Sequence, residues 1–286
     1  MKLVRYGDPG REKPGCLDKA GCLRDLSHLI SDIAGDALSP AKLAELSKLE
    51  TESLPLVENQ PRLGPCVHQV GKFLCIGLNY EDHAKETGVE NPSEPVVFLK
   101  ATSAITGPYD PIVIPHGSTH TDWEVELGVV IGKRAKHVPL GKAGDYIAGY
   151  CVINDVSERH FQKHNTSQWA KGKSCDTFGP IGPWLVTSDE IADPQQLSLW
   201  LEVDGKRYQD GHTSKMIFDV KHLVSYLSRF FTLYPGDIIS TGTPAGVGYA
   251  QKPEAIYLKP GQTVRLGITG LGEQKHKTTA EDILPR

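Results

Sequence analysis

Residues 122–127 read Asp-Trp-Glu-Val-Glu-Leu, and this stretch decides how the rest of the chain is interpreted. Side chains on a β-strand alternate between its two faces, so Glu124 and Glu126 are expected to share one face. The apolar side chains around them would point into the core: Trp123, Val125 and Leu127. Two carboxylates on one face repel each other unless a cation lies between them, and oxygen ligands suit Mg²⁺, Mn²⁺ or Ca²⁺. A half-exposed strand with both acids in water is the alternative.

A second apolar run also ends in an acid. Residues 146–155 read Tyr-Ile-Ala-Gly-Tyr-Cys-Val-Ile-Asn-Asp, a pattern that is typical of a buried strand. Asp155 stands at its end and is the natural third carboxylate for a metal site with Glu124 and Glu126. Another metal candidate, His116 and His120 with Asp122, is disfavoured because Pro115, Gly117 and Ser118 predict a loop.

Size and composition are those of an ordinary globular protein. The chain has 286 residues, of which 39% are hydrophobic and 23% charged, so it can bury a substantial core. The formal net charge of −4 argues against a nucleic-acid partner, because nucleic-acid binders usually carry a basic surface. No apolar run approaches the roughly 18 residues that a membrane span needs, and residues 1–8 lack the apolar core of a signal peptide. Six cysteines without a Cys-x-x-Cys pair favour a cytoplasmic enzyme with reduced thiols.

The chain is predicted to divide into a small N-terminal accessory domain, residues 1–65, and a catalytic domain, residues 66–286. A helix is expected from Ser39, with proline at its first position. Residues 53–65 are rich in Pro and polar side chains and predict a linker. No catalytic constellation precedes the linker.

The larger domain is predicted to consist mainly of short strands. An amphipathic helix is expected over residues 219–231. The strands are expected at residues 73–78, 96–100, 112–114, 123–131, 146–154, 197–203, 237–240 and 263–269. This pattern predicts a mixed α+β fold, mainly β, with a mixed sheet or β-roll architecture.

Residues 79–88 predict a short helix that ends at Gly88. His83 and Glu86 are three residues apart and therefore neighbours on one helix face. One interpretation is a solvated pair; the other is a dyad in which the carboxylate orients the imidazole as a general base on water. A Pro-containing loop over residues 91–95 would let this helix act as a lid.

Three further features suggest a binding site. Arg159 and Gln162 share a face of a predicted helix, although Arg159 could simply pair with a surface acid. Lys173 lies in a Gly-Lys-Ser triplet that is no Walker A motif, because position 167 is Ser. A partly buried ammonium there could offset a developing negative charge. Residues 241–248, Thr-Gly-Thr-Pro-Ala-Gly-Val-Gly, predict a turn whose N–H groups could bind an anion such as a substrate carboxylate.

Taken together and in order, these motifs resemble those of the fumarylacetoacetate hydrolase family. The matching segments are Ile76-Gly77-Leu78-Asn79-Tyr80 with His83 and Glu86, Asp122 to Leu127, Asn154-Asp155 with Arg159, Gly172-Lys173-Ser174 with Asp176, and Thr241 to Gly248. The resemblance covers roughly residues 70–280. It is nearest to bacterial hydrolases of 2,4-diketo-3-deoxy sugar acids of the L-rhamnonate or L-fuconate type, some relatives of which carry a ureidoglycolate lyase label.

The resemblance implies a fumarylacetoacetate hydrolase-like β-sandwich roll, a homodimer and a divalent cation, usually Mg²⁺, with Mn²⁺ or Ca²⁺ as alternatives. The positions that match its metal ligands are Glu124, Glu126 and Asp155. The positions that match its water-activating dyad and its charge-stabilising lysine are His83, Glu86 and Lys173. The positions that match substrate contacts are Arg159, Gln162 and Thr243. Residues 163–166 match no pattern and leave the specificity for the substrate's tail open.

The implied reaction is hydrolysis of a carbon–carbon bond in a small 2,4-diketo acid, such as 2,4-diketo-3-deoxy-L-rhamnonate, to pyruvate and a second acid. Water activated by His83 would attack the carbonyl at carbon four, and the metal and Lys173 would stabilise the enolate that leaves. A lyase, either oxaloacetate decarboxylase or ureidoglycolate lyase, is the alternative, and the dyad favours hydrolysis. A non-catalytic binding module would have no need for the trio, the dyad and the lysine together.

Overall fold

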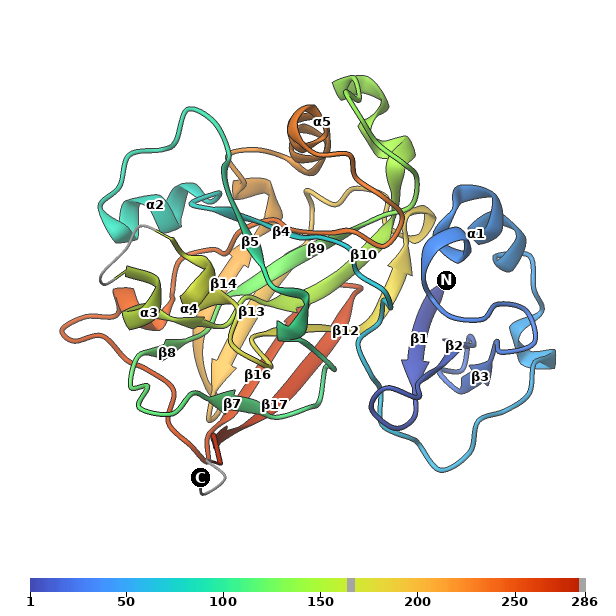
Figure 1. Cartoon of the computed structure of the whole chain (residues 1–286), viewed down its shortest axis with the longest axis horizontal. Coiled ribbons are helices and arrows are strands. Elements are labelled where there is room, and N and C mark those ends of the chain that lie inside the picture. The colour runs from blue at the N-terminus through green and yellow to red at the C-terminus, as the bar shows by residue number, and fades with distance from the viewer. Residues whose placement is uncertain (164–167, 283–286) are drawn as a thin grey trace.

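Two β-sheets packed against each other form the framework of the computed structural model, which describes residues 1–163 and 168–282 (Figure 1). The ten-stranded sheet runs β3 (Leu23–Asp25), β2 (Lys13–Leu17), β1 (Lys2–Tyr6), β12 (Gly179–Thr187), β10 (Ile147–Asn154), β9 (Val125–Ile131), β15 (Ile238–Ser240), β4 (Phe73–Gly77) and β5 (Val96–Lys100), with β6 (Ile105–Thr106) paired to β12. The five-stranded sheet runs β14 (Lys206–His212), β13 (Ser198–Val203), β16 (Thr263–Ile268), β17 (Gly272–Ala280) and β7 (Ile112–Ile114). A separate ladder pairs β8 (Thr121–Asp122) with β11 (Ser157–Glu158).

Helices are short and lie around these sheets. The α-helices are α1 (Pro40–Leu46), α2 (Glu81–Thr87), α3 (Arg159–Lys163), α4 (Ala170–Lys173) and α5 (Val220–Phe230). The 3₁₀ turns are Gly35–Leu38, Thr51–Ser53, Thr102–Ala104, Leu140–Tyr146, Ser188–Glu190, Thr213–Lys215 and Gly248–Ala250. Within the described residues, no helix is long and apolar enough to cross a membrane. The predicted mixed α+β fold, mainly β, is confirmed.

Helix ends follow the local sequence as predicted. Ser39 caps α1, because its side chain accepts the N–H of Lys42 at 3.3 Å. Asp219 caps α5 in the same way. Gly88 ends α2 with a φ of +72°, in the left-handed region that glycine adopts without a steric penalty.

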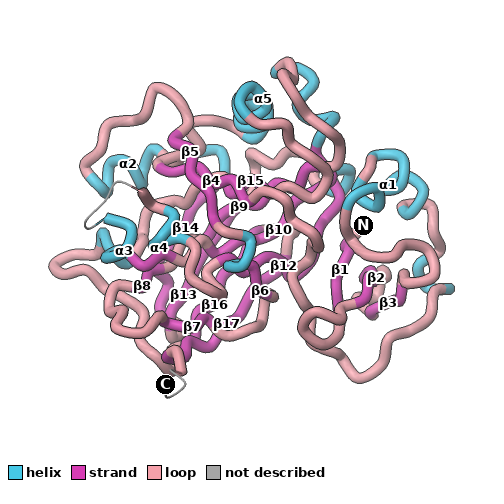
Figure 2. Tube along the Cα trace, viewed as in Figure 1, coloured by secondary structure: helices cyan, strands magenta, loops and turns pink. Residues whose placement is uncertain are grey.

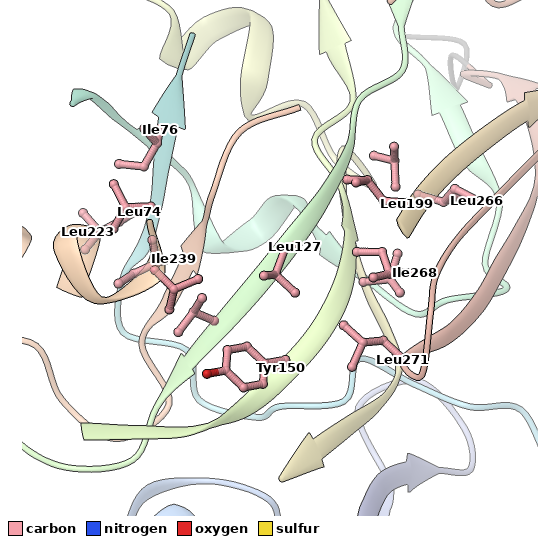
Figure 3. Close-up of a cluster of buried hydrophobic side chains, with 14 of the residues drawn as sticks. Leu74, Ile76, Leu127, Tyr150, Leu199, Leu223, Ile239, Leu266, Ile268 and Leu271 are labelled. Atoms are coloured by element: carbon pink, nitrogen blue, oxygen red, sulfur yellow. The ribbon is translucent and has the colours of Figure 1, made fainter. Parts of the chain in front are cut away.

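Strand alternation sends side chains from the ten-stranded sheet into two cores. On β4, Leu74 and Ile76 face the core between the two sheets, while Phe73 and Cys75 face a core on the other side. Figure 3 shows the first core, in which Leu127 of β9 lies between side chains of both sheets. The side chains labelled around it are Leu74, Ile76, Tyr150, Leu199, Leu223, Ile239, Leu266, Ile268 and Leu271. The centre of β9 is therefore covered on both faces.

The N-terminal strands extend the main sheet. Leu3 of β1 pairs with Leu185 of β12, and Leu3 also packs in the second core with Phe73. Between these strands and β4, residues 54–64 form no regular strand or helix, as the predicted linker requires. The domain boundary at residue 65 stays a prediction.

The strand expected over residues 123–131 begins two residues later, at Val125, which corrects the sequence interpretation. A carboxylate oxygen of Asp122 accepts the N–H of Trp123 at 2.7 Å, and Asn154 Oδ1 accepts the N–H of Glu124 at 3.2 Å. These two N–H groups therefore leave the ladder, and β9 begins only after them. The expected burial of the three apolar side chains is confirmed, since none of them is exposed: Trp123, Val125 and Leu127.

Candidate active site

A cavity of about 270 Å³ opens beside α2, α3 and α4. Figure 1 shows these helices at one end of the molecule, opposite the N-terminal strands, and Figure 2 shows them as a group of cyan segments. The predicted site residues that line the cavity are His83, Glu124, Glu126, Arg159, Gln162, Lys173 and Thr243. The structure thus brings together side chains from distant parts of the chain.

Three carboxylates converge at the base of this cavity. Ligand atoms of Glu124, Glu126 and Asp155 all lie within 4.8 Å of one another, and all three residues are buried. Their proximity follows from the pairing of β9 with β10, in which Asn154 stands opposite Val125. The N–H of Asp155 also donates to the carbonyl of Glu124 at 2.9 Å. The sheet therefore fixes the spacing of the trio.

Two buried lysines contact the trio. Lys173 Nζ lies 2.7 Å from Glu124 Oε2 and 2.6 Å from Asp155 Oδ2. Lys100 Nζ lies 2.5 Å from Asp155 Oδ1. Burial alone would lower the pKa of Lys173, but Asp155 and Glu124 raise it, so the ammonium stays protonated.

Arg159 joins the trio to a fourth buried acid. Its guanidinium contacts Asp122 Oδ2 at 2.7 Å and Glu124 Oε1 at 2.6 Å. Burial alone would raise the pKa of Glu124, but Lys173 and Arg159 hold it below its ordinary value. Arg159 also donates to Gln162 Oε1 at 3.1 Å, so these predicted substrate contacts bind each other.

Glu126 differs from the other acids, because no cationic side chain of the described residues lies within ion-pair distance of it. Its Oε2 accepts the hydroxyl of Ser240 at 2.6 Å and the N–H of Gly242 at 2.8 Å. Burial, followed by the negative charges of Asp155 and Glu124, raises the pKa of Glu126 well above its ordinary value. An ionised Glu126 therefore needs a cation that the described part of the chain does not supply.

This arrangement fits a hard divalent cation. Carboxylate oxygens are the ligands that Mg²⁺, Mn²⁺ and Ca²⁺ prefer, and each carboxylate has about four lone-pair sites, so contact with a lysine leaves sites for an ion. The ion would also compensate the unpaired charge of Glu126. Among the described residues, no other His, Cys, Asp and Glu side chains gather in this way, so the alternative at His116 and His120 is not assembled.

The predicted dyad lies on another wall of the same cavity. His83 Nδ1 is 3.3 Å from Glu86 Oε2, and His83 is 8% exposed. Both oxygens of Glu86 accept the N–H of Gly246, at 3.0 and 3.1 Å. The carboxylate is therefore held between the imidazole and the backbone, which is the geometry that orients a general base.

A buried asparagine sets the start of α2. The amide of Asn79 donates to the carbonyls of Phe218 and Thr241, at 3.0 and 2.7 Å, and its Oδ1 accepts the N–H of Phe218. The residue before it, Leu78, has a φ of +53°, a left-handed conformation that is uncommon for a leucine. This sharp turn brings α2 over the cavity directly after β4.

The glycine-rich turn binds anions, but these are carboxylates of the protein. Its N–H groups donate to Glu126 from Gly242, to Glu86 from Gly246, and to Asp122 from Gly248 at 2.7 Å. These three N–H groups are therefore used by the protein itself, and contact between other groups of the turn and a substrate carboxylate stays a prediction. Thr243 lines the cavity, but its hydroxyl donates to the carbonyl of Val125 and accepts from Gln209.

Sequence reasoning did not assign a role to two residues of this network. Lys100 is the last residue of an apolar strand, and this position is the one feature of the sequence that indicates its burial. Asp122 accepts from Arg159, Gly248 and Tyr249, which come from two segments far from it in the sequence, and no local pattern could reveal this. Together they hold the ends of the carboxylate cluster in place.

Comparison with known proteins settles the family. A family model described as fumarylacetoacetate (FAA) hydrolase C-terminal matches residues 72–279. The chain belongs to the fumarylacetoacetate hydrolase family. It is an enzyme of that family, and the sandwich fold described above is the one found in its solved relatives.

Relatives of this fumarylacetoacetate hydrolase family member match it along its whole length. A Burkholderia orbicola protein with a provisional hydrolase name and no stated substrate is 62% identical over 278 residues, which cover 97% of this chain and 99% of the relative. A fumarylacetoacetate hydrolase structure from Exiguobacterium antarcticum is 34% identical with a TM-score of 0.84, over 98% of this chain and 100% of that one. The structure of maleylpyruvate hydrolase from Sphingobium sp. SYK-6, in complex with manganese(II) and pyruvate, is 26% identical with a TM-score of 0.81, over 99% and 100% of the two chains.

Proposed function

We propose that this enzyme hydrolyses a carbon–carbon bond in a 2,4-diketo acid and uses a divalent cation to do so. The observation that carries the proposal is that one cavity is lined by Glu124 and Glu126 of a buried carboxylate trio and by His83 of a His–Glu dyad, with Asp155 and Glu86 in contact behind them. The first group suits an ion that binds keto and carboxylate oxygens, and the second suits the activation of water. The similar maleylpyruvate hydrolase structure, which holds manganese(II) and pyruvate, supports this proposal.

Glu124, Glu126 and Asp155 would hold the cation, for which we propose Mg²⁺, with Mn²⁺ or Ca²⁺ as substitutes. When bound, such an ion supplies Lewis acidity toward the oxygens of a 2-keto acid. Among the described residues, no basic side chain pairs with Glu126, so its carboxylate can pair with the ion. Lys100 and Lys173 hold the other acids in place.

His83 acts as the base in the proposed reaction. Glu86 accepts the hydrogen on Nδ1, which leaves the other ring nitrogen to take a proton from water. The hydroxide adds to the carbonyl at carbon four, and the bond between carbons three and four then breaks. Its electron pair stays on carbon three as the enolate of pyruvate, and the acyl fragment leaves as a carboxylic acid. The proton held by His83 balances the reaction when it returns to carbon three.

Lys173 contributes electrostatic stabilisation. Its ammonium has three N–H groups, of which Glu124 and Asp155 accept two, and the residue lines the cavity. The remaining N–H can donate to an oxygen on which negative charge develops. A preorganised donor of this kind typically changes the rate by about 10²–10³-fold.

The substrate's tail, the assembly and the cellular location belong to the proposal as well. Sugar acids such as 2,4-diketo-3-deoxy-L-rhamnonate are one class of tail, and simpler acylpyruvates are another. A homodimer is proposed from the family resemblance, and a cytoplasmic location from the cysteine pattern of the sequence.

Pyruvate release from a panel of substrates tests the proposal. The panel holds acylpyruvates, a 2,4-diketo-3-deoxy sugar acid and oxaloacetate, with ureidoglycolate followed by glyoxylate release. Each is measured with EDTA and with Mg²⁺ or Mn²⁺ restored, and with His83→Ala as the matched variant. Metal-dependent pyruvate from diketo acids that is lost in His83→Ala is the expected result. Turnover of only oxaloacetate or ureidoglycolate would replace the hydrolase with a lyase.

A further inference from the structure

The proposed reaction assigns no role to one cationic side chain that lines the cavity. The lining includes Arg159, Lys163 and Lys173. Carboxylates pair with Arg159 and Lys173, as described above. Within residues 1–163 and 168–282, no carboxylate forms an ion pair with Lys163. A cation that lines a substrate cavity without a counter-ion is a candidate binding group.

Lys163 is held at the cavity wall by an aromatic ring. Its Nζ lies 3.4 Å from the centre of the Tyr249 ring, a cation–π contact. Tyr249 also lines the cavity, and its backbone N–H donates to Asp122 Oδ2 at 3.0 Å. The backbone of Tyr249 is thus bound to Asp122, the same acid that orients Arg159. The ring of Tyr249 in turn positions the ammonium of Lys163 at the cavity wall.

The pKa of Lys163 is lowered, chiefly by desolvation. Tyr249 opposes this shift through a side-chain hydrogen bond and its charge, while the charge of Arg159 adds to the shift and that of Glu124 opposes it. A ring quadrupole attracts an ammonium but does not neutralise it. A ligand carboxylate would supply the missing negative charge.

The position of Lys163 sets where such a carboxylate would lie. Lys163 follows Arg159 by four residues on α3, so both side chains are on one face, about 6 Å apart along the helix axis. Arg159 touches the trio through Glu124, whereas Lys163 is one turn further from it. A ligand anchored at the trio would reach Lys163 with its other end.

The cavity wall also includes apolar side chains that offer no hydrogen bonds. They are Ile76, Leu78, Val89, Phe98 and Val247. A polyhydroxylated tail against these side chains would leave hydroxyl groups without hydrogen-bond partners, which disfavours its binding. A hydrocarbon segment fits them better.

We propose that Lys163, held by Tyr249, recognises a second carboxylate at the far end of the substrate. The substrate class is then a dicarboxylic acylpyruvate, with a short hydrocarbon segment between the diketo acid and the terminal carboxylate. This inference rests on the proposed function for the placement of the first carboxylate and the 2-keto group. It favours a dicarboxylic tail over the sugar-acid tail.

Binding of non-hydrolysable 2-oxo acids tests this assignment without relying on turnover. The probes are 2-oxoglutarate, 2-oxoadipate and 2-oxopimelate, each compared by calorimetry with the monoacid of equal chain length: 2-oxopentanoate, 2-oxohexanoate and 2-oxoheptanoate. All titrations contain Mg²⁺ and the full chain. We expect at least one dicarboxylate to bind about tenfold or more tightly than its monoacid, as a charge-assisted contact provides.

Variants assign the preference to Lys163. In Lys163→Met the preference should fall to within about twofold, and Lys163→Arg should retain most of it. Lys171→Met, which removes a charge from a nearby lysine outside the cavity lining, is the control and should keep the preference.

The outcomes separate the two proposals. Equal binding of diacids and monoacids, no binding of any diacid, or a preference that persists in Lys163→Met would each overturn the role of Lys163. A preference that depends on Lys163, in an enzyme that releases no pyruvate from any diketo acid, would instead overturn the hydrolase proposal and leave this binding site standing.

Discussion

Two walls of one cavity are held in different ways. The carboxylate wall is formed by Glu126 on β9 and by Glu124 and Asp155, which directly flank β9 and β10 of the ten-stranded sheet. Glu124 and Asp155 each contact two cationic side chains. The dyad wall belongs to α2, a helix of only seven residues. Near the C-terminal end of α2, the carboxylate of Glu86 is bound to the glycine-rich turn through one donor, the N–H of Gly246.

This difference separates binding from reaction. A helix this short has little stability of its own and depends on its tertiary contacts. The carboxylate wall is instead fixed by strand pairing on both sides. We therefore expect changes in the carboxylate wall to remove the cofactor, and changes in the dyad wall to slow the chemistry while ligands still bind.

The largest effect is expected from Glu126→Gln. This change keeps the shape of the side chain but removes the one acid without a cationic partner. Metal affinity should fall by about 100-fold or more, with loss of metal-dependent pyruvate release. Without metal, the thermal midpoint should stay equal or rise, because Glu126 must either hold a proton or carry a buried unpaired charge there, and the neutral amide requires neither. Titration with Mn²⁺ and melting with and without EDTA measure both, and unchanged metal binding would exclude Glu126 as a ligand.

His83→Ala is expected to separate the two walls. Loss of the base should lower turnover by about 10²–10⁴-fold, while Mn²⁺ and pyruvate bind as in the unaltered enzyme. Single-turnover kinetics and calorimetry provide the two readouts. Unaltered turnover would remove the dyad from the mechanism, and lost metal binding would show that the two walls are not independent.

Lys100→Met tests how the carboxylate wall is positioned. Its ammonium supports Asp155, so metal affinity should weaken by about 10–100-fold, as for other groups that orient metal ligands. The free energy of unfolding should also fall, because a buried ion pair loses one partner. Lys42→Met, which breaks an exposed pair with Glu45, is the control and should change neither quantity measurably. Unchanged affinity in Lys100→Met would assign Lys100 to folding alone.

Metal binding should depend on pH through Glu126. Because the pKa of Glu126 is raised, metal must displace a proton from it, and apparent affinity should increase by up to about tenfold per pH unit. The increase should level off once Glu126 is ionised in the metal-free protein. Calorimetry in two buffers of different ionisation enthalpy measures the released proton. A flat profile over acidic and neutral pH would contradict the raised pKa.

The smallest effect is expected at the loop that follows α2. Tyr226 Oη of α5 donates to Glu94 Oε2 at 2.9 Å, an exposed contact that connects this loop to the rest of the fold. Tyr226→Phe should change KM by no more than about three- to fivefold, since one exposed hydrogen bond contributes little. Glu94→Gln should behave similarly. A loss of turnover as large as in His83→Ala would show that this contact governs the dyad wall.

Local patterns predict much of this fold. The bounds of β1, β5 and β7 agree with their apolar runs, and the caps of α1, α2 and α5 agree with single residues. The trio could be predicted because the alternation of residues 122–127 and the acid that ends residues 146–155 are both visible in the sequence. Its assembly depends on the register of β9 against β10, which the pattern constrains by requiring both faces to be buried.

Among the strands that escaped prediction, the two longest did so for opposite reasons. β12 reads Gly-Pro-Ile-Gly-Pro-Trp-Leu-Val-Thr, and two prolines argue against a strand within a sheet. β17 has polar side chains at its buried positions, and Gln274 and His276 satisfy them by bonding to the carbonyls of Val152 and Asp110. Such bonds join residues more than a hundred positions apart, so no local rule reveals them.

The turn from Gly242 to Gly248 has a consequence for how the enzyme can diversify. The N–H groups of this one segment bind carboxylates from three different elements. The segment has little room for change, because a Cβ at Gly246 would lie 2.0 Å from the carbonyl oxygen of Tyr208. Changes here would disturb the cofactor site and the dyad at once. New substrate ranges should therefore arise through side chains of α3 and the α2 loop, and a mutagenesis library aimed at specificity belongs there.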